Sequence, residues 1–148
     1  MTTAELYPIA LSLRVAAIAL MIVGPVGVLL AWLQARRRYP LHGLVDALVL
    51  LPLVLPPSVI GFLLVLVFGR RGLVGHALEA LGVRLVFSPA AAVLASAVVA
   101  LPILVKTLQP ALEAVPGELE AVGRSLGLGP LALFVRVTLP ASWRGLVA

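Results

Sequence analysis

Three stretches of the chain contain no charged side chain and are almost entirely apolar, at residues 15–33, 47–69 and 85–105. Each is close to the ~20 residues that an α-helix needs to cross about 30 Å of hydrocarbon. The pattern predicts spans at about residues 10–34, 45–68 and 86–106. A further apolar run predicts the start of a fourth span from about residue 134, in a chain that we expect to be truncated at its C-terminal end. The predicted fold class is an all-α, polytopic membrane helical bundle.

Composition and charge favour the same class. Hydrophobic residues make up 62% of the chain and charged residues 11%, against roughly 45–50% and about 25% in soluble domains. The net charge of +5 is interpreted as cytoplasmic loops of a membrane protein rather than as a nucleic-acid-binding face. The distribution of basic residues predicts an N-terminus outside the cell: Arg36, Arg37, Arg38, Lys106, Arg124 and Arg136 on the cytoplasmic side, against Arg14, Arg70, Arg71 and Arg84.

Prolines interrupt the predicted spans, and Pro56 and Pro57 lie in the middle of the second one. Each proline removes a backbone donor, so the freed carbonyl must be satisfied by a neighbouring helix, by the Ser58 hydroxyl or by water in a cavity. We therefore take Pro56, Pro57 and Ser58 as candidate residues of a translocation path. A kink that only improves helix packing is the alternative interpretation. The three apolar stretches contain no charged residue, which argues against a proton relay or an ion-coupled carrier.

A predicted cytoplasmic loop at about residues 110–133 contains the most informative pattern. Glu118 and Glu120 would lie in the first turn of a helix that starts near Pro116, where carboxylates meet the positive end of the helix dipole. Glu120 and Arg124 are four residues apart and can pair. A stripe of apolar residues has helical spacing, which predicts a short amphipathic helix: Val115, Leu119, Val122 and Leu126.

A glycine-rich elbow follows this helix. Gly127 lies just past the helix end, where a left-handed cap needs no Cβ atom, and Gly129 with Pro130 closes the turn and starts another helix. A helix that lies on the lipid surface is the plainer interpretation of the same pattern.

The spacing after Gly127 resembles a known signature. Permease subunits of bacterial binding-protein-dependent ABC importers contain a loop whose tail has the pattern G-x9-I-x-L-P. The present chain resembles this pattern, with Gly127 followed by nine residues, Val137, one further residue and Leu139-Pro140. That pattern opens with Glu-Ala-Ala, which here falls on residues 121–123. Glu120 lies one place earlier, so either Glu120 or Ala121 fills the acidic position. Residues 51–64, 69–75 and 101–113 are similar to the molybdate-importer permeases.

The resemblance implies an ABC importer permease fold and a homodimer in the inner (cytoplasmic) membrane. It implies cytoplasmic ATP-binding subunits and an extracytoplasmic oxyanion-binding protein as partners, with molybdate as the cargo. Sulfate, thiosulfate and tungstate permeases are the alternatives. The residues that the resemblance assigns to an ATPase-coupling loop are Glu118, Glu120, Ala121, Val122, Gly123, Arg124, Gly127, Leu128, Gly129, Leu139 and Pro140.

The chain lacks the motifs of several other functions. It contains no G-x-x-x-x-G-K-[ST] sequence, so ATP hydrolysis is expected in a separate subunit and no catalytic residue or cofactor is assigned. His42 and His76 fall in different loops without an acidic cluster, which argues against a metal site. A membrane-embedded enzyme would need polar groups that converge within the spans. A non-transporting membrane scaffold, whose amphipathic helix docks a partner, is the remaining alternative.

Overall fold

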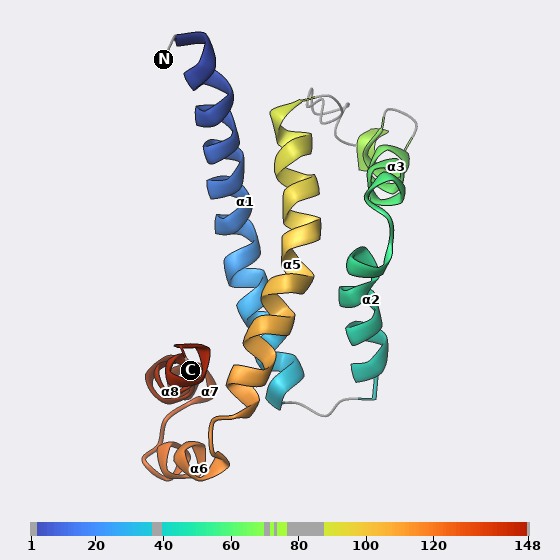
Figure 1. The fold of residues 1–148 in the computed structure, drawn as a ribbon. Coiled ribbons are helices and arrows are strands. Elements are labelled where there is room, and N and C mark those ends of the chain that lie inside the picture. Colours follow the sequence, from blue (N-terminus) through green and yellow to red (C-terminus); the bar gives the residue numbers. More distant parts are fainter. Residues whose placement is uncertain (1–2, 37–39, 70–71, 73, 77–87, 148) are drawn as a thin grey trace.

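The computed structural model describes residues 3–36, 40–69, 72, 74–76 and 88–147, and the regular elements among them are helices. Two are long and apolar enough to cross a membrane: Tyr7–Arg36 of helix α1 (Thr3–Arg36) and helix α5 (Pro89–Glu113). These two helices pack along each other at the centre of the structure (Figure 1). The fold is an all-α membrane helical bundle, as the sequence predicts.

The predicted second span is two helices that meet at a sharp angle. Helix α2 (His42–Val54) and helix α3 (Pro57–Phe68) are bent by 114° relative to each other. Leu55 and Pro56 between them have extended backbones, with ψ angles of 139° and 143°, because a residue that precedes a proline is disfavoured in the α conformation. Two successive prolines therefore end one helix and start the next. The sequence suggested a kink here, and the structure has a complete break.

Small side chains allow α1 and α5 to approach closely. One buried cluster combines Ala19 and Val23 of α1 with Ala97 of α5. A second cluster, nearer the C-terminal end of both helices, includes Ala31 and Val105. Between them, a Cβ atom on Gly27 would lie 2.6 Å from Leu104 Cδ2. Such small-residue contacts are how membrane helices gain van der Waals packing without a hydrophobic driving force.

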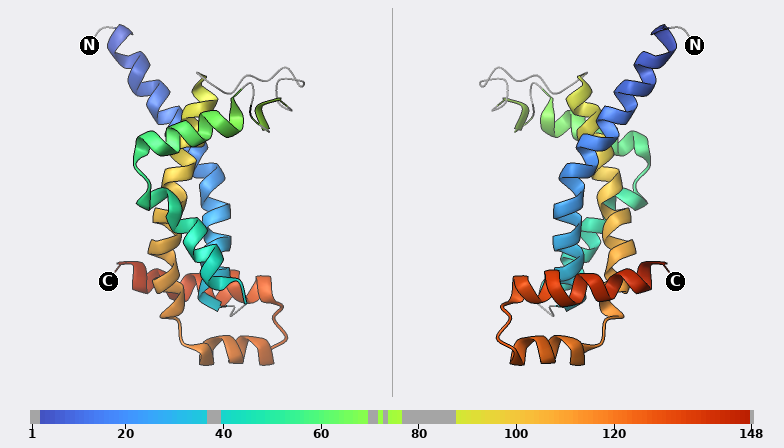
Figure 2. Two further views of the ribbon diagram at one scale, coloured as in Figure 1. Left: turned by 90° about the vertical axis from the view of Figure 1, so that its right-hand side faces the viewer. Right: turned by 90° about the vertical axis from the view of Figure 1, so that its left-hand side faces the viewer.

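The C-terminal part of the chain turns beneath this bundle. Helix α6 (Gly117–Ser125) lies beyond the ends of α1 and α5, and helices α7 (Pro130–Leu133), η1 (Phe134–Thr138) and α8 (Leu139–Val147) form one continuous run. Figure 2 shows that this run lies crosswise to α1 and α5. Residues from 134, where a fourth span was expected to start, thus do not rise alongside the two long helices.

A π-helical turn in the crosswise run has a local cause. The Leu139 N–H bonds the Phe134 carbonyl, five residues earlier, instead of the usual four. Pro140 follows directly, and in an α-helix its ring would clash with the carbonyl of residue 136 while leaving that carbonyl without a donor. The wider turn accommodates the proline without ending the helix.

Some sequence-based expectations concern residues outside the described part of the chain. These are residues 86–87 of the third expected span, parts of segment 69–75, and the side chains of Arg37, Arg38, Arg70, Arg71 and Arg84 that entered the charge comparison.

Candidate functional site

The elbow after α6 is a Schellman cap centred on Gly127. Gly127 has φ +80°, in the left-handed region that glycine adopts without strain. The Leu128 N–H donates to the Gly123 carbonyl at 3.1 Å, and the Gly127 N–H donates to the Arg124 carbonyl at 3.0 Å. These two bonds are the 6→1 and 5→2 pair that defines the motif. The left-handed cap predicted at Gly127 is confirmed, and Gly129 caps α7, which begins at Pro130.

The apolar face of α6 points away from the rest of the structure. Leu119, Val122 and Leu126 are exposed, with Leu126 the most exposed at 76%. Val115, the first residue of the expected stripe, precedes α6 and is buried. The buried residues of α6 are Glu120 and Gly123. This helix therefore presents leucine and valine outward and turns a carboxylate inward, the reverse of a helix that packs on its own core.

Glu120 is held by three side chains from different places in the chain. Its Oε1 atom accepts a hydrogen bond from Thr138 Oγ1 of η1 at 2.8 Å and lies 3.0 Å from Arg36 Nε at the end of α1. Its Oε2 atom lies 3.8 Å from Arg124 Nη2. Glu120 is 6% exposed and Thr138 is fully buried. The expected Glu120–Arg124 pair is present, but the closer cation is Arg36, which the sequence did not single out.

Arg36 makes a second contact in the same region. Its Nη2 atom donates to the Val115 carbonyl at 3.1 Å, in the link between α5 and α6. The guanidinium therefore bridges that link and the first turn of α6. We call Arg36, Glu120 and Thr138 the Glu120 node.

The other residues assigned to the coupling loop lie in three settings. Glu118, Ala121, Val122 and Arg124 are exposed on α6. Gly123 faces α7, and a Cβ atom there would overlap with the Leu133 side chain. Leu139 and Pro140 are exposed on the crosswise run at the end of the π turn. Because Ala121 is exposed and Glu120 is buried, the two candidates for the acidic position have opposite orientations.

A pocket of about 530 Å³ opens beside the Glu120 node. Its wall includes both arginines that contact Glu120, together with an aromatic side chain from α1: Trp32, Ala35, Arg36, Gly117, Glu120, Arg124, Leu128, Pro130 and Leu133. Trp32 also contacts Phe134 of η1, with ring centroids 5.6 Å apart. The crosswise run is thus fixed to α1 by an aromatic contact, separately from the contacts of α6.

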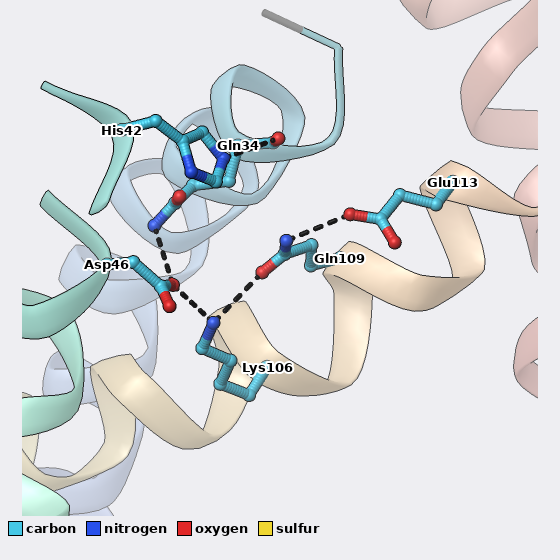
Figure 3. A network of polar contacts seen from close by, with 6 residues as sticks. All are labelled: Gln34, His42, Asp46, Lys106, Gln109 and Glu113. Carbon is cyan, nitrogen blue, oxygen red and sulfur yellow. Dashed lines mark hydrogen bonds and ion pairs between the residues drawn. The ribbon is translucent and has the colours of Figure 1, made fainter. Parts of the chain in front are cut away.

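A second polar cluster joins α1, α2 and α5 at the same end of the bundle (Figure 3). The Lys106 ammonium forms an ion pair with Asp46 and also donates to Gln109 Oε1 at 3.2 Å. Gln34 Nε2 donates to Asp46 Oδ1 at 3.3 Å. His42 Nε2 donates to the Gln34 carbonyl at 3.1 Å, in the tautomer that this contact requires. The cluster holds three helix ends together by hydrogen bonds and one partly buried ion pair.

No sequence pattern pointed to a site role for four residues of these clusters, Arg36, Asp46, Lys106 and Thr138. A signal for the second cluster does exist: Lys106 lies in the C-terminal half of α5, and Asp46 lies near the start of α2, so their opposite charges fall toward the same end of neighbouring helices. Thr138 and Arg36 are both distant in sequence from Glu120, and no local pattern connects them. Only the fold brings the node together.

Pro56, Pro57 and Ser58 are exposed at the start of α3. A small apolar pocket of about 170 Å³ lies inside the bend between α2 and α3. Its lining includes Leu51, Leu55, Ile60 and Val98 but none of the three residues taken as path candidates. Among the described residues, no group of three or more His, Asp or Glu side chains is placed to hold a metal ion.

Comparison with known families decides the class. Residues 23–148 match the family described as "Binding-protein-dependent transport system inner membrane component". The chain belongs to this family. The match includes α5, α6, the Gly127 elbow and the crosswise run, so the site described above lies within the family domain. The family consists of membrane components of transport systems rather than of enzymes.

Individual members of the family are similar over almost the whole chain. The "Molybdenum transport system permease protein ModB" of Escherichia coli K12 is 40% identical over 99% of the chain and 65% of its own length. The protein of the same name in Mycobacterium tuberculosis is 43% identical over 93% of the chain and 52% of its own length. The "Probable sulfate transport system permease protein cysT" of Mesostigma viride is 36% identical over 90% of the chain and 50% of its own length. The chain thus spans between half and two thirds of these relatives.

Proposed function

We propose that this chain forms part of the transmembrane subunit of an ATP-driven oxyanion importer, in which α6 docks on a cytoplasmic ATP-binding subunit. The observation that carries the proposal is the outward apolar face of α6. A nine-residue helix that exposes Leu119 and Val122, is followed by an exposed Leu126 at its C-cap, and buries Glu120 suits an apolar groove on a partner protein. The Gly127 cap fixes how the helix leaves that groove.

The proposed mechanism depends on the docking helix α6 and on the uncharged apolar stretches. ATP binding in the partner would change the separation of the two α6 helices of a homodimer and thereby shift the spans between inward-open and outward-open states. The apolar stretches carry no fixed charge, so we expect the anion to pass without a tight site in the spans. Selectivity would then reside in an extracytoplasmic binding protein.

Molybdate is the proposed cargo because relatives that are 40% and 43% identical are named as molybdenum transport permeases. Sulfate is the second candidate, since a relative named as a probable sulfate permease is 36% identical. Both are tetrahedral dianions. Uptake of each labelled anion by vesicles that contain the assembled full-length transporter and its binding protein distinguishes them.

Docking is tested by a leucine pair with equal exposure. Leu126 at the C-cap of α6 and Leu131 on α7 are both 76% exposed. We expect Leu126→Glu to abolish co-purification of the ATP-binding subunit and ATP-dependent uptake, because it places a charge in an apolar groove. Leu131→Glu should leave both largely intact. Retained co-purification in Leu126→Glu would show that α6 is not the docking element. Normal co-purification of the unmodified protein without uptake would favour a scaffold.

Orientation has its own test, because the sequence contains no cysteine. Single cysteines at Tyr7 and Leu126, both exposed, should react from opposite sides of sealed vesicles. The proposal places Leu126 on the cytoplasmic side and Tyr7 outside. Labelling of position 126 from outside would exclude contact with a cytoplasmic ATPase.

A further inference from the structure

We propose that Arg36 is a positioning residue that makes α1 move together with α6 when the ATP-binding subunit moves α6. This inference rests on the proposed function and specifies a route by which movement of the docking helix reaches the first span. Arg36 is the last residue of α1, and its guanidinium contacts α6 directly.

The attachment of α6 to the bundle depends on few contacts. The links at its two ends are short, and the second contains the left-handed Gly127. Neither of the two buried apolar clusters found among the described residues includes a residue of α6. What holds α6 from the side is the Glu120 node, together with the approach of Gly123 to Leu133.

The geometry of Arg36 fits this role better than that of Arg124. Arg36 lies 3.0 Å from Glu120 Oε1 with a side chain that is 19% exposed, whereas Arg124 lies 3.8 Å from Oε2 and is 64% exposed. Arg124 also belongs to α6 itself, so its contact with Glu120 cannot connect α6 to another element. Arg36 additionally binds the Val115 carbonyl. The same guanidinium thus pairs with Glu120 as an ion pair, without a hydrogen bond at Nε, and donates a hydrogen bond to the Val115 carbonyl.

The crosswise run and α6 are attached to α1 by different contacts. The crosswise run is fixed to α1 by the Trp32–Phe134 contact and would remain in place without Arg36. Loss of Arg36 would therefore remove the direct contact between α6 and α1, and α6 would stay connected to α1 only indirectly, through the crosswise run. Glu120 would then retain only Thr138 and the exposed Arg124. An α6 that moves alone would leave ATP hydrolysis intact but would not drive the spans.

The experiment uses the assembled full-length transporter in vesicles and measures anion uptake and ATP hydrolysis in parallel. We expect Arg36→Gln to lower the number of anions moved per ATP hydrolysed by roughly tenfold or more, within the usual range of coupling between sites. Arg36→Lys should give an intermediate ratio. Arg14→Gln makes the same change at an exposed position on the same helix and should leave the ratio unchanged.

A distance measurement separates coupling from general damage. Cysteines that replace Leu29 on α1 and Ser125 on α6, both exposed, would carry the spin labels, and any cysteine elsewhere in the assembly would first be replaced. In the otherwise unmodified transporter, their separation should stay constant when ATP binds, since α1 follows α6. In Arg36→Gln, the separation should change or broaden on ATP binding.

The outcomes distinguish this inference from the proposed function. If the unmodified assembly fails to import anions, the proposed function fails. If it imports anions and Arg36→Gln keeps the same ratio and the same constant separation, the role of Arg36 is wrong. Should Arg36→Gln fail to assemble, Arg36→Lys and the nearly isosteric Thr138→Val, which removes the hydrogen bond to Glu120, carry the test. A normal ratio in both would overturn the inference.

Discussion

The left-handed backbone at Gly127 gives the most quantitative prediction. A Cβ atom on Gly127 would meet nothing within 4 Å, so a side chain there meets no neighbouring group. The cost of substitution is therefore the cost of φ +80° itself, which is about 1–2 kcal/mol for an ordinary L-residue. Asparagine tolerates this region better than alanine does, and a β-branched residue tolerates it worst. The expected order of damage is asparagine, alanine, valine.

Gly129 provides the matched control two residues away. It also has open space around its Cα atom, but its φ is −68°, which any residue adopts. Gly129→Ala should therefore be neutral or slightly stabilising, by about 0.4–1 kcal/mol, because alanine restricts the unfolded chain. The two glycines differ in backbone conformation and not in available space.

The assay is the affinity of the full-length permease for the ATP-binding subunit proposed above as its partner. A penalty of about 1–2 kcal/mol on the docking-competent elbow lowers its population by roughly 5–30-fold, and apparent affinity should fall by the same factor. Membrane insertion should be unaffected. Equal losses for Gly127→Ala and Gly129→Ala would refute the backbone argument. Substrate uptake at the unmodified rate by Gly127→Val would refute the assignment of the elbow to coupling.

Two further predictions concern the bundle. Gly27→Ala should lower the stability of the protein in detergent by about 1–3 kcal/mol, since the added methyl group crowds Leu104, whereas Gly24→Ala, at a position with open space, should not. Equal melting temperatures for the two variants would show that α1 and α5 are not packed this closely. Asp46→Asn should lower stability by only about 1 kcal/mol, because the Asp46–Lys106 pair is only partly buried. A double variant with Lys106→Met should lose less stability than the sum of the two single losses, and additive shifts in melting temperature would contradict a direct pair.

The sequence predicted the elements of this fold that depend on local chemistry. Apolar stretches of the right length predicted the two long helices, and Gly127 and Gly129-Pro130 predicted the elbow with its cap. Both follow from properties of residues close in sequence, such as helix length, backbone freedom and proline geometry.

Directions and long-range contacts were not predictable in the same way. Helical spacing gave an apolar stripe on α6 but could not say whether it faced inward or outward, since burial depends on what the rest of the chain places nearby. The Arg36–Glu120 contact joins two distant segments, and the crosswise course of residues 130–147 is a property of the packed bundle. At residues 45–68 the prolines suggested a kink or a cavity within one span, but apolar length and proline positions alone do not reveal a 114° break.

The outward apolar face of α6 has a consequence for how cells make the protein. On the proposed function, a subunit produced without its ATP-binding partner would display leucine and valine to the aqueous compartment, where such surfaces favour aggregation and attract chaperones and proteases. Synthesis of the two components in matched amounts would keep this helix covered. We therefore expect the lifetime of the orphan subunit to be short, and to lengthen when the ATP-binding subunit is co-expressed.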